Sequence, residues 1–156
     1  MAYKSKDLPP HVRAMMRREE QARRQRAAAN APPMGDVITI TLPLPPKSLS
    51  PNSRSHWRVK AKDTRKSRQV AACRTICALM GARPEWDTAT LQATFYHYQN
   101  RRRDDDNLIA SLKAYRDGLV DGGLLNDDVG VTTLPVVKHI DRDRPRCELT
   151  ITKGKP

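Results

Sequence analysis

Three adjacent carboxylates follow three adjacent arginines in the segment Arg101–Asn107. Asp104 and Asp106 are two residues apart, so in extended backbone their side chains point the same way. Magnesium prefers oxygen ligands and is usually held by one or two carboxylates, with water and phosphate completing its shell. A magnesium ion held in this way polarises a phosphodiester and activates a bound water. The spacing therefore predicts a magnesium site suited to phosphodiester hydrolysis, for which Mn²⁺ is the expected substitute.

A third carboxylate from elsewhere in the chain would help to close such a site. The turn Asn126-Asp127-Asp128 follows the next expected helix and offers two. An alternative needs no metal, because aspartate is a common helix N-cap and Asn-Asp is a common turn. The spacing alone leaves both interpretations open.

The elements that must position these residues follow from periodicity. Residues 37–42 and 90–98 alternate between apolar and polar side chains and predict strands, the first ended by Pro43, Pro45 and Pro46. A polar loop over 47–60 leads to a helix that starts at Asp63 or Thr64 and ends near Met80. We expect its buried stripe to comprise Val70, Cys73, Cys77 and Met80, with both thiols buried.

A second helix is expected over 108–120, directly after the acidic segment. A strand over 131–140, with Pro135 marking an edge or bulge, and a final alternating strand over 147–152 complete the pattern as a plausible hairpin. The order β-α-β-α-β-β predicts an α+β fold, with a mixed β-sheet of about four strands and two main helices. Residues 1–35 form a separate basic N-terminal arm, helical over 11–29 or flexible, and residues 36–156 form the folded domain.

The segment Arg103–Ile109, followed by an amphipathic helix and Leu125-Asn-Asp-Asp128, resembles the RusA family of Holliday-junction resolvases. The strand that runs into Leu42-Pro43-Leu44-Pro45-Pro46, followed by Asn52-Ser53-Arg54, fits the same family. The resemblance covers roughly residues 36–153. It implies a homodimer that cuts opposed strands of a four-way junction in DNA recombination and repair. It also implies that Asp104, Asp106 and Asp128 are magnesium ligands, with Asp127 as the substitute for Asp128.

One position departs from the family pattern. The family has a catalytic lysine one turn after the second motif aspartate, and here that position is Ala110. Lys113 lies two turns after Asp106 on nearly the same helical face, and its side chain leans toward the N-terminus. Lys113 is therefore the candidate that stabilises charge on the phosphate. The alternative is a surface ion pair with Asp117 at i, i+4 spacing.

Two groups of residues suit DNA contacts. Arg101, Arg102 and Arg103 carry the bidentate donors that phosphates favour, and the alternative is that they balance the charge of the neighbouring aspartates. The loop after the first strand carries Asn52, Arg54, Trp57 and Arg58. Trp57 suits stacking on an unpaired base, and the alternative is a core anchor.

The bulk composition agrees with a nucleic-acid partner, because the 156-residue chain has a net charge of +12. No apolar run is long enough for a transmembrane helix, and no apolar segment follows the basic N-terminus as in a secretion signal. We expect a cytoplasmic protein with three free thiols and no membrane partner, of a size that suits a phage or prophage. The competing hypothesis is a non-catalytic basic DNA-binding or DNA-packaging accessory protein.

Overall fold

A computed structural model describes residues 9–12, 14–16, 18–19 and 35–154. The chain divides into two units, Met1–Pro33 and Met34–Pro156. In the first unit, the described residues at 10–12, 14–16 and 18–19 are helical. The rest of the helix predicted over 11–29 lies outside the described residues.

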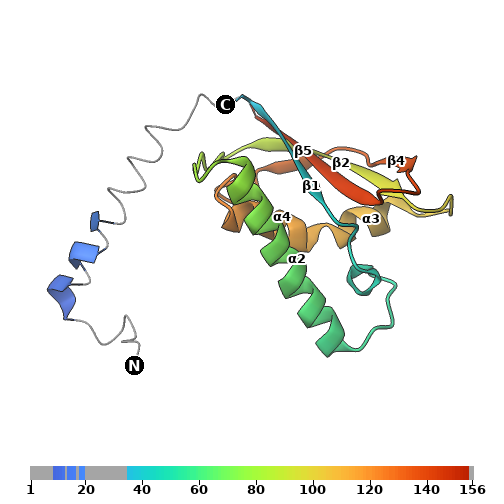
Figure 1. The fold of residues 1–156 in the computed structure, drawn as a ribbon, viewed down its shortest axis with the longest axis horizontal. Coiled ribbons are helices and arrows are strands. Elements are labelled where there is room, and N and C mark those ends of the chain that lie inside the picture. Colours follow the sequence, from blue (N-terminus) through green and yellow to red (C-terminus); the bar gives the residue numbers. More distant parts are fainter. Residues whose placement is uncertain (1–8, 13, 17, 20–34, 155–156) are drawn as a thin grey trace. The chain divides into compact units, whose positions relative to one another are not determined.

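The second unit is built on a mixed five-stranded sheet (Figure 1). Its strands are β1 (Val37–Leu42), β2 (Ala89–His97), β3 (Val131–Thr133), β4 (Val137–Ile140) and β5 (Arg146–Lys153). Strand β5 lies between β1 and β2 and is antiparallel to both. Strands β3 and β4 both pair with β2, in parallel. The predicted α+β class with a mixed sheet is confirmed.

Helices cover one face of this sheet, as Figure 1 shows for α2, α3 and α4. They are α2 (Trp57–Ala78), α3 (Asp105–Ser111) and α4 (Lys113–Asp121), preceded by the short 3-10 helix η2 (Lys47–Leu49). The core lies between the helices and the sheet. On β2 the predicted inward residues Leu91, Ala93 and Phe95 are all fully buried, which confirms the alternation there.

The C-terminal third of the domain differs from the predicted hairpin. The expected strand over 131–140 is interrupted between Thr133 and Val137, where the Pro135 carbonyl accepts a hydrogen bond from Gln92 Nε2 at 2.5 Å. Its second half, β4, pairs with β2 rather than with β5. The predicted hairpin is therefore wrong, because β5 pairs with β1 and β2 instead. The interruption raises the strand count to five.

Helix α2 begins earlier than predicted. Its N-cap is His56, whose imidazole Nδ1 accepts the backbone N–H of Arg58 at 3.2 Å. The predicted start at Asp63 or Thr64 is wrong. Asp63 instead accepts a hydrogen bond from the Ser48 hydroxyl, and Thr64 donates to the Lys60 carbonyl within the helix. The His56 imidazole accepts the hydrogen bond that Ser, Thr, Asp or Asn usually accepts at an N-cap, so the usual capping residue types do not predict this helix start.

The buried face of α2 also differs from the prediction. Ser67, Ala71 and Thr75 are buried, whereas Cys73, Cys77 and Met80 are exposed, so the prediction of two buried thiols is wrong. The reason lies in α4, which packs against α2. A Cβ added to Gly118 would lie 2.5 Å from the Cβ of Ala71, and one added to Gly122 would lie 2.5 Å from the Cβ of Thr75. Two backbones this close admit only small side chains, whatever the apolar periodicity suggests.

The helix predicted over 108–120 is two helices, α3 and α4, with the break at Leu112. Leu112 is fully buried, and so is Tyr115, whose hydroxyl donates to the Pro43 carbonyl at 2.9 Å. That bond fixes α4 against the end of β1. No helix in the described ranges is both long and apolar enough to cross a membrane.

Candidate active site

The first acidic turn connects β2 to α3. Asp104 is the N-cap residue of α3, with extended backbone, and Asp105 and Asp106 form the first helical turn. The Asp104 carboxylate makes no capping bond to a backbone amide. Among the described residues, its side-chain hydrogen bond is a long one of 3.5 Å from the Asn107 amide. Asp104 therefore holds the N-cap position while its carboxylate remains free for another ligand.

The three carboxylates of this turn have different partners. Asp105 Oδ1 lies 2.6 Å from Lys138 Nζ, which comes from β4. Within the described part of the chain, no ion pair involves Asp104 or Asp106. Both are exposed. The ion pair thus separates one neutralised carboxylate from two that are free to bind a cation.

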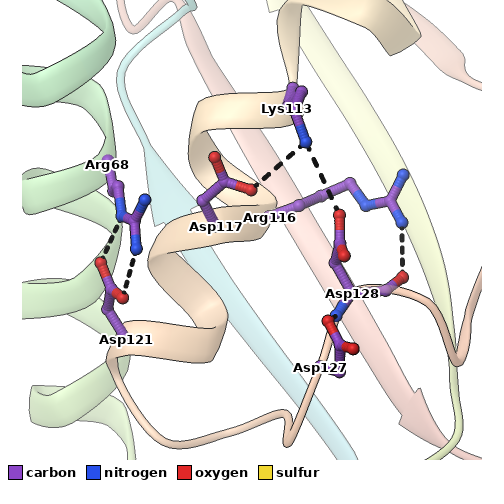
Figure 2. A network of polar contacts seen from close by, with 7 residues as sticks. All are labelled: Arg68, Lys113, Arg116, Asp117, Asp121, Asp127 and Asp128. Carbon is purple, nitrogen blue, oxygen red and sulfur yellow. Dashed lines mark hydrogen bonds and ion pairs between the residues drawn. The ribbon is translucent and has the colours of Figure 1, made fainter.

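The second acidic turn follows α4 and is drawn in Figure 2. Asp127 Oδ1 accepts the backbone N–H of Asp128 at 2.6 Å, so this carboxylate holds the turn together. The Asp128 carboxylate lies 3.8 Å from Lys113 Nζ. Arg116 Nη2 donates to the backbone carbonyl of Asp128 at 2.8 Å, which anchors the turn to α4. The Asp127 carboxylate is thus bonded within the turn, whereas the Asp128 carboxylate makes a long contact with Lys113.

Lys113 makes the surface contact with Asp117 that was the alternative interpretation, and it also contacts Asp128. Its ammonium lies 3.7 Å from Asp117 in the i, i+4 pair and 3.8 Å from Asp128 (Figure 2). Both distances are long for ion pairs, and the Lys113 side chain is 75% exposed. The Lys113 ammonium therefore forms no short ion pair with either carboxylate.

A magnesium site at the first acidic turn would use the carboxylates of Asp104 and Asp106. These are hard oxygen donors without a cationic partner among the described residues, which is the donor chemistry that magnesium needs. Among the described residues, no group of three or more His, Cys, Asp or Glu side chains is arranged to hold a metal ion. Two carboxylates with water and phosphate remain compatible with magnesium, since it seldom uses an all-protein shell.

A cavity of about 560 Å³ lies beside Asp104, and we call it the proline-walled cavity. Its lining includes Pro45, Pro46, Phe95, Asp104, Asn107 and Ser111. The two halves of the sequence pattern, the proline-rich strand end and the acidic segment, are some 60 residues apart in the chain. The fold brings them together, because Pro45 and Pro46 line the same cavity as Asp104 and as Phe95 of β2.

A second cavity of about 620 Å³ shares Arg102 and Arg103 with the first, and we call it the basic cavity. Its lining includes Arg101, Arg102, Arg103, Lys138 and His139. Arg103 also donates to the carbonyls of Gln99 at 3.2 Å and Arg101 at 3.1 Å, and so braces the loop. Arg101 and Arg102 are exposed, and no carboxylate pairs with them in the described residues. Of the predicted triplet, these two have donors free for an anion.

His97 belongs to the wall of both cavities. It is only 8% exposed, and its Nε2 has no hydrogen-bond partner in the described structure. Burial lowers the pKa of His97, and the nearby charges of Arg103 and Lys138 lower it further. The imidazole is therefore neutral near pH 7, which leaves the positive charge of the site to its arginines and lysine.

The other residues predicted to contact DNA line neither of these cavities; they are Asn52, Arg54, Trp57 and Arg58. Asn52 and Arg54 are exposed, and Trp57 is 67% exposed, so its interpretation as a core anchor is wrong. The Arg58 guanidinium carbon lies 5.3 Å from the centre of the Trp57 ring. An exposed indole with a cation over it keeps the predicted stacking role available.

Sequence reasoning missed Lys138, His139 and His97 as site residues. Parallel pairing of β4 with β2, in which Lys138 is opposite Phe95, brings Lys138 to Asp105 and His139 to the basic cavity. The sequence interval between them carries no signal of that register. The unpartnered His97 gave no signal either, because a histidine on an alternating strand usually has a structural role.

No protein-family model matches the chain. An uncharacterized protein of Xylella fastidiosa is 34% identical to it over 122 residues, which is 73% of this chain and 75% of that protein. This chain belongs to the same family as the Xylella protein.

Proposed function

We propose that this protein is a magnesium-dependent, structure-selective DNA endonuclease that resolves four-way junctions by paired cleavage. One observation carries the proposal. Asp104 and Asp106 are exposed carboxylates without a cationic partner in the described residues, and Asp104 lines the proline-walled cavity, which shares Arg102 and Arg103 with the basic cavity. Free acidic groups beside free arginines suit a cation and a phosphodiester together.

The residues have distinct roles in this proposal. Asp104 and Asp106 hold the cation. Asp128 is the third carboxylate, and it binds the cation in place of its long contact with Lys113. Bound magnesium supplies a Lewis acid and an activated water. Arg101 and Arg102 bind the phosphates that flank the cut, and Lys113 offsets charge that develops on the phosphate. The exposed Trp57 stacks on a base that the branch point leaves unpaired.

The resemblance to RusA resolvases supports a homodimer on branched DNA, since paired cuts need two sites. The net charge of +12 supports a nucleic-acid partner. We place the protein in the cytoplasm, where it would meet DNA.

A second function has its own supporting observation. Among the described residues, no three potential metal ligands are gathered in one group. A basic DNA-binding or DNA-packaging accessory protein would need no such group, and its acidic turn would only begin a helix. The two functions differ in whether DNA is cut.

The experiment uses a synthetic four-way junction labelled on each strand in turn. Wild-type protein and Asp106→Asn are incubated with it in EDTA, in Mg²⁺ and in Mn²⁺. We expect symmetric paired nicks that need the metal, and a loss of at least about a hundredfold in Asp106→Asn with binding retained.

The matched control is Asp36→Asn, which removes the same charge from an exposed residue beside Lys153, at the end of the sheet where β2 begins and away from the acidic segment. It should cut as the wild type does. If every protein binds the junction and none cuts it in either metal, the nuclease is excluded and the accessory protein becomes the better account.

A further inference from the structure

We propose that the basic cavity is a phosphate subsite for the DNA strand, with Lys138 of β4 as its central cation. The inference rests on the proposed DNA substrate. It adds Lys138 and His139 of β4, which lie far from the acidic segment in the sequence. No acidic side chain lines this cavity in the described structure. A hollow of about 620 Å³ lined by arginine, lysine and amide side chains matches a phosphodiester better than a neutral or cationic ligand.

The position of Lys138 is set by the sheet. Parallel pairing places Lys138 opposite Phe95 and Ile140 opposite His97, at the end of β2 that leads into the acidic segment. From there the ammonium lies 2.6 Å from Asp105 Oδ1 and 3.3 Å from the Arg103 carbonyl oxygen. Lys138 therefore ties the edge strand to both the acidic and the basic part of the loop.

The donor count leaves room for a ligand. A lysine ammonium has three N–H donors. Two of them serve Asp105 and Arg103, and the third remains for an oxygen in the cavity that Lys138 lines. The Lys138 side chain is 42% exposed, so an incoming phosphate can reach it.

The ion pair also removes a repulsive charge. Three free carboxylates beside the cavity would repel a phosphate. Lys138 neutralises Asp105, so only Asp104 and Asp106 keep charges for a cation. Asp105 is consequently a partner of Lys138 rather than a metal ligand.

His139 extends the same subsite. It stacks on Tyr96 with ring centroids 5.3 Å apart, and Tyr96 in turn lies beneath the Arg146 guanidinium at 3.7 Å. This stack holds the imidazole at the edge of the basic cavity. Lys138 and His139 point to opposite faces of β4, and both line the cavity.

The test measures binding without cleavage, so that it does not depend on the nuclease activity. A labelled four-way junction is titrated in EDTA over a series of salt concentrations with wild type, Lys138→Ala and Lys138→Arg. We expect Lys138→Ala to weaken binding by about fivefold to tenfold and to reduce the salt slope by about one. Lys138→Arg should restore most of the affinity.

The matched control is Lys153→Ala, an exposed lysine at the opposite end of the sheet, opposite Ala89. It removes the same charge and should change affinity by less than about twofold. If Lys138→Ala and Lys153→Ala bind alike, the subsite is excluded and only general charge attraction remains. Thermal unfolding of each variant verifies that the fold is intact.

Asp105→Asn provides a second reading. It should strengthen junction binding and leave the magnesium requirement of cleavage unchanged, because Lys138 gains a free donor and no metal ligand is lost. A loss of cleavage as large as that of Asp106→Asn would overturn the assignment of Asp105. If no variant cuts but Lys138→Ala still binds weakly, the subsite stands and the nuclease fails.

Discussion

The two ends of α4 carry ion pairs of opposite character, and Figure 2 shows both. At the last residue of the helix, Asp121 accepts two bonds from Arg68 of α2, of 2.5 and 2.7 Å. At the first residue, Lys113 is shared between Asp117 and Asp128 at 3.7 and 3.8 Å. A bidentate guanidinium pair has a fixed geometry, whereas a long ammonium contact does not. We infer that the first contact is scaffold and the second can exchange partners with a ligand.

The comparison depends most on Asp128. Asp128→Asn should lower junction cleavage by about a hundredfold, because the third carboxylate of the proposed site is lost. Its melting temperature should stay within about 1 °C of wild type, since the contact to Lys113 is long and exposed. Cleavage rates and thermal unfolding check this. Full activity in Asp128→Asn would show that Asp128 has no role in cleavage and serves only the structure of the turn.

The scaffold end can be broken through the glycine that brings the two helices together. Gly118→Ala places a methyl group 2.5 Å from both the Ala71 Cβ and the Arg68 carbonyl oxygen. Overpacking of this kind should lower the free energy of unfolding by about 1–3 kcal/mol. Chemical denaturation measures it. Gly35→Ala, which meets no atom within 4 Å, is the matched control and should be neutral.

Lys113 tests the exchangeable end directly. Lys113→Ala should reduce cleavage by about tenfold, because one positive charge near the phosphate is lost. Lys113→Arg should recover part of it, and junction affinity should change little. Single-turnover rates with saturating protein separate this loss from weaker binding. An unchanged rate in Lys113→Ala would leave only the surface pair with Asp117.

The smallest effect concerns Asp121. The hydrogen bonds from Arg68 hold the pKa of Asp121 below its usual 3.8. The stability that this pair contributes is therefore present above pH 3.8 and is lost as the pH falls through the lower folded-state value. Asp121→Asn should lower the melting temperature at pH 7 by about 3 °C, with cleavage unchanged.

The pH series for Asp121→Asn carries its own control. Because the contribution is lost in acid, the difference in melting temperature between wild type and variant should shrink below pH 3.8. A difference that is constant from pH 7 to pH 3 would show that the pair contributes by packing and not by charge.

The sequence by itself determined the local features of this protein. Alternation identified β1, β2 and β5, and the acidic segment was correctly placed between a strand and a helix. These features depend on neighbours within a few residues, which periodicity reports well. The same reasoning failed for α2, where the buried face follows the glycines of α4 rather than the apolar stripe.

Only the tertiary structure decided which residues meet. The parallel register of β4 on β2 brings Lys138 to Asp105, and the proline-rich strand end lines the same cavity as Asp104. Neither contact joins residues close in sequence, so no local pattern reports it. The exposed ion pair of Lys138 with Asp105 contributes little to the stability of the fold. Their partners are set by the backbone, which aliphatic burial and strand pairing hold in place.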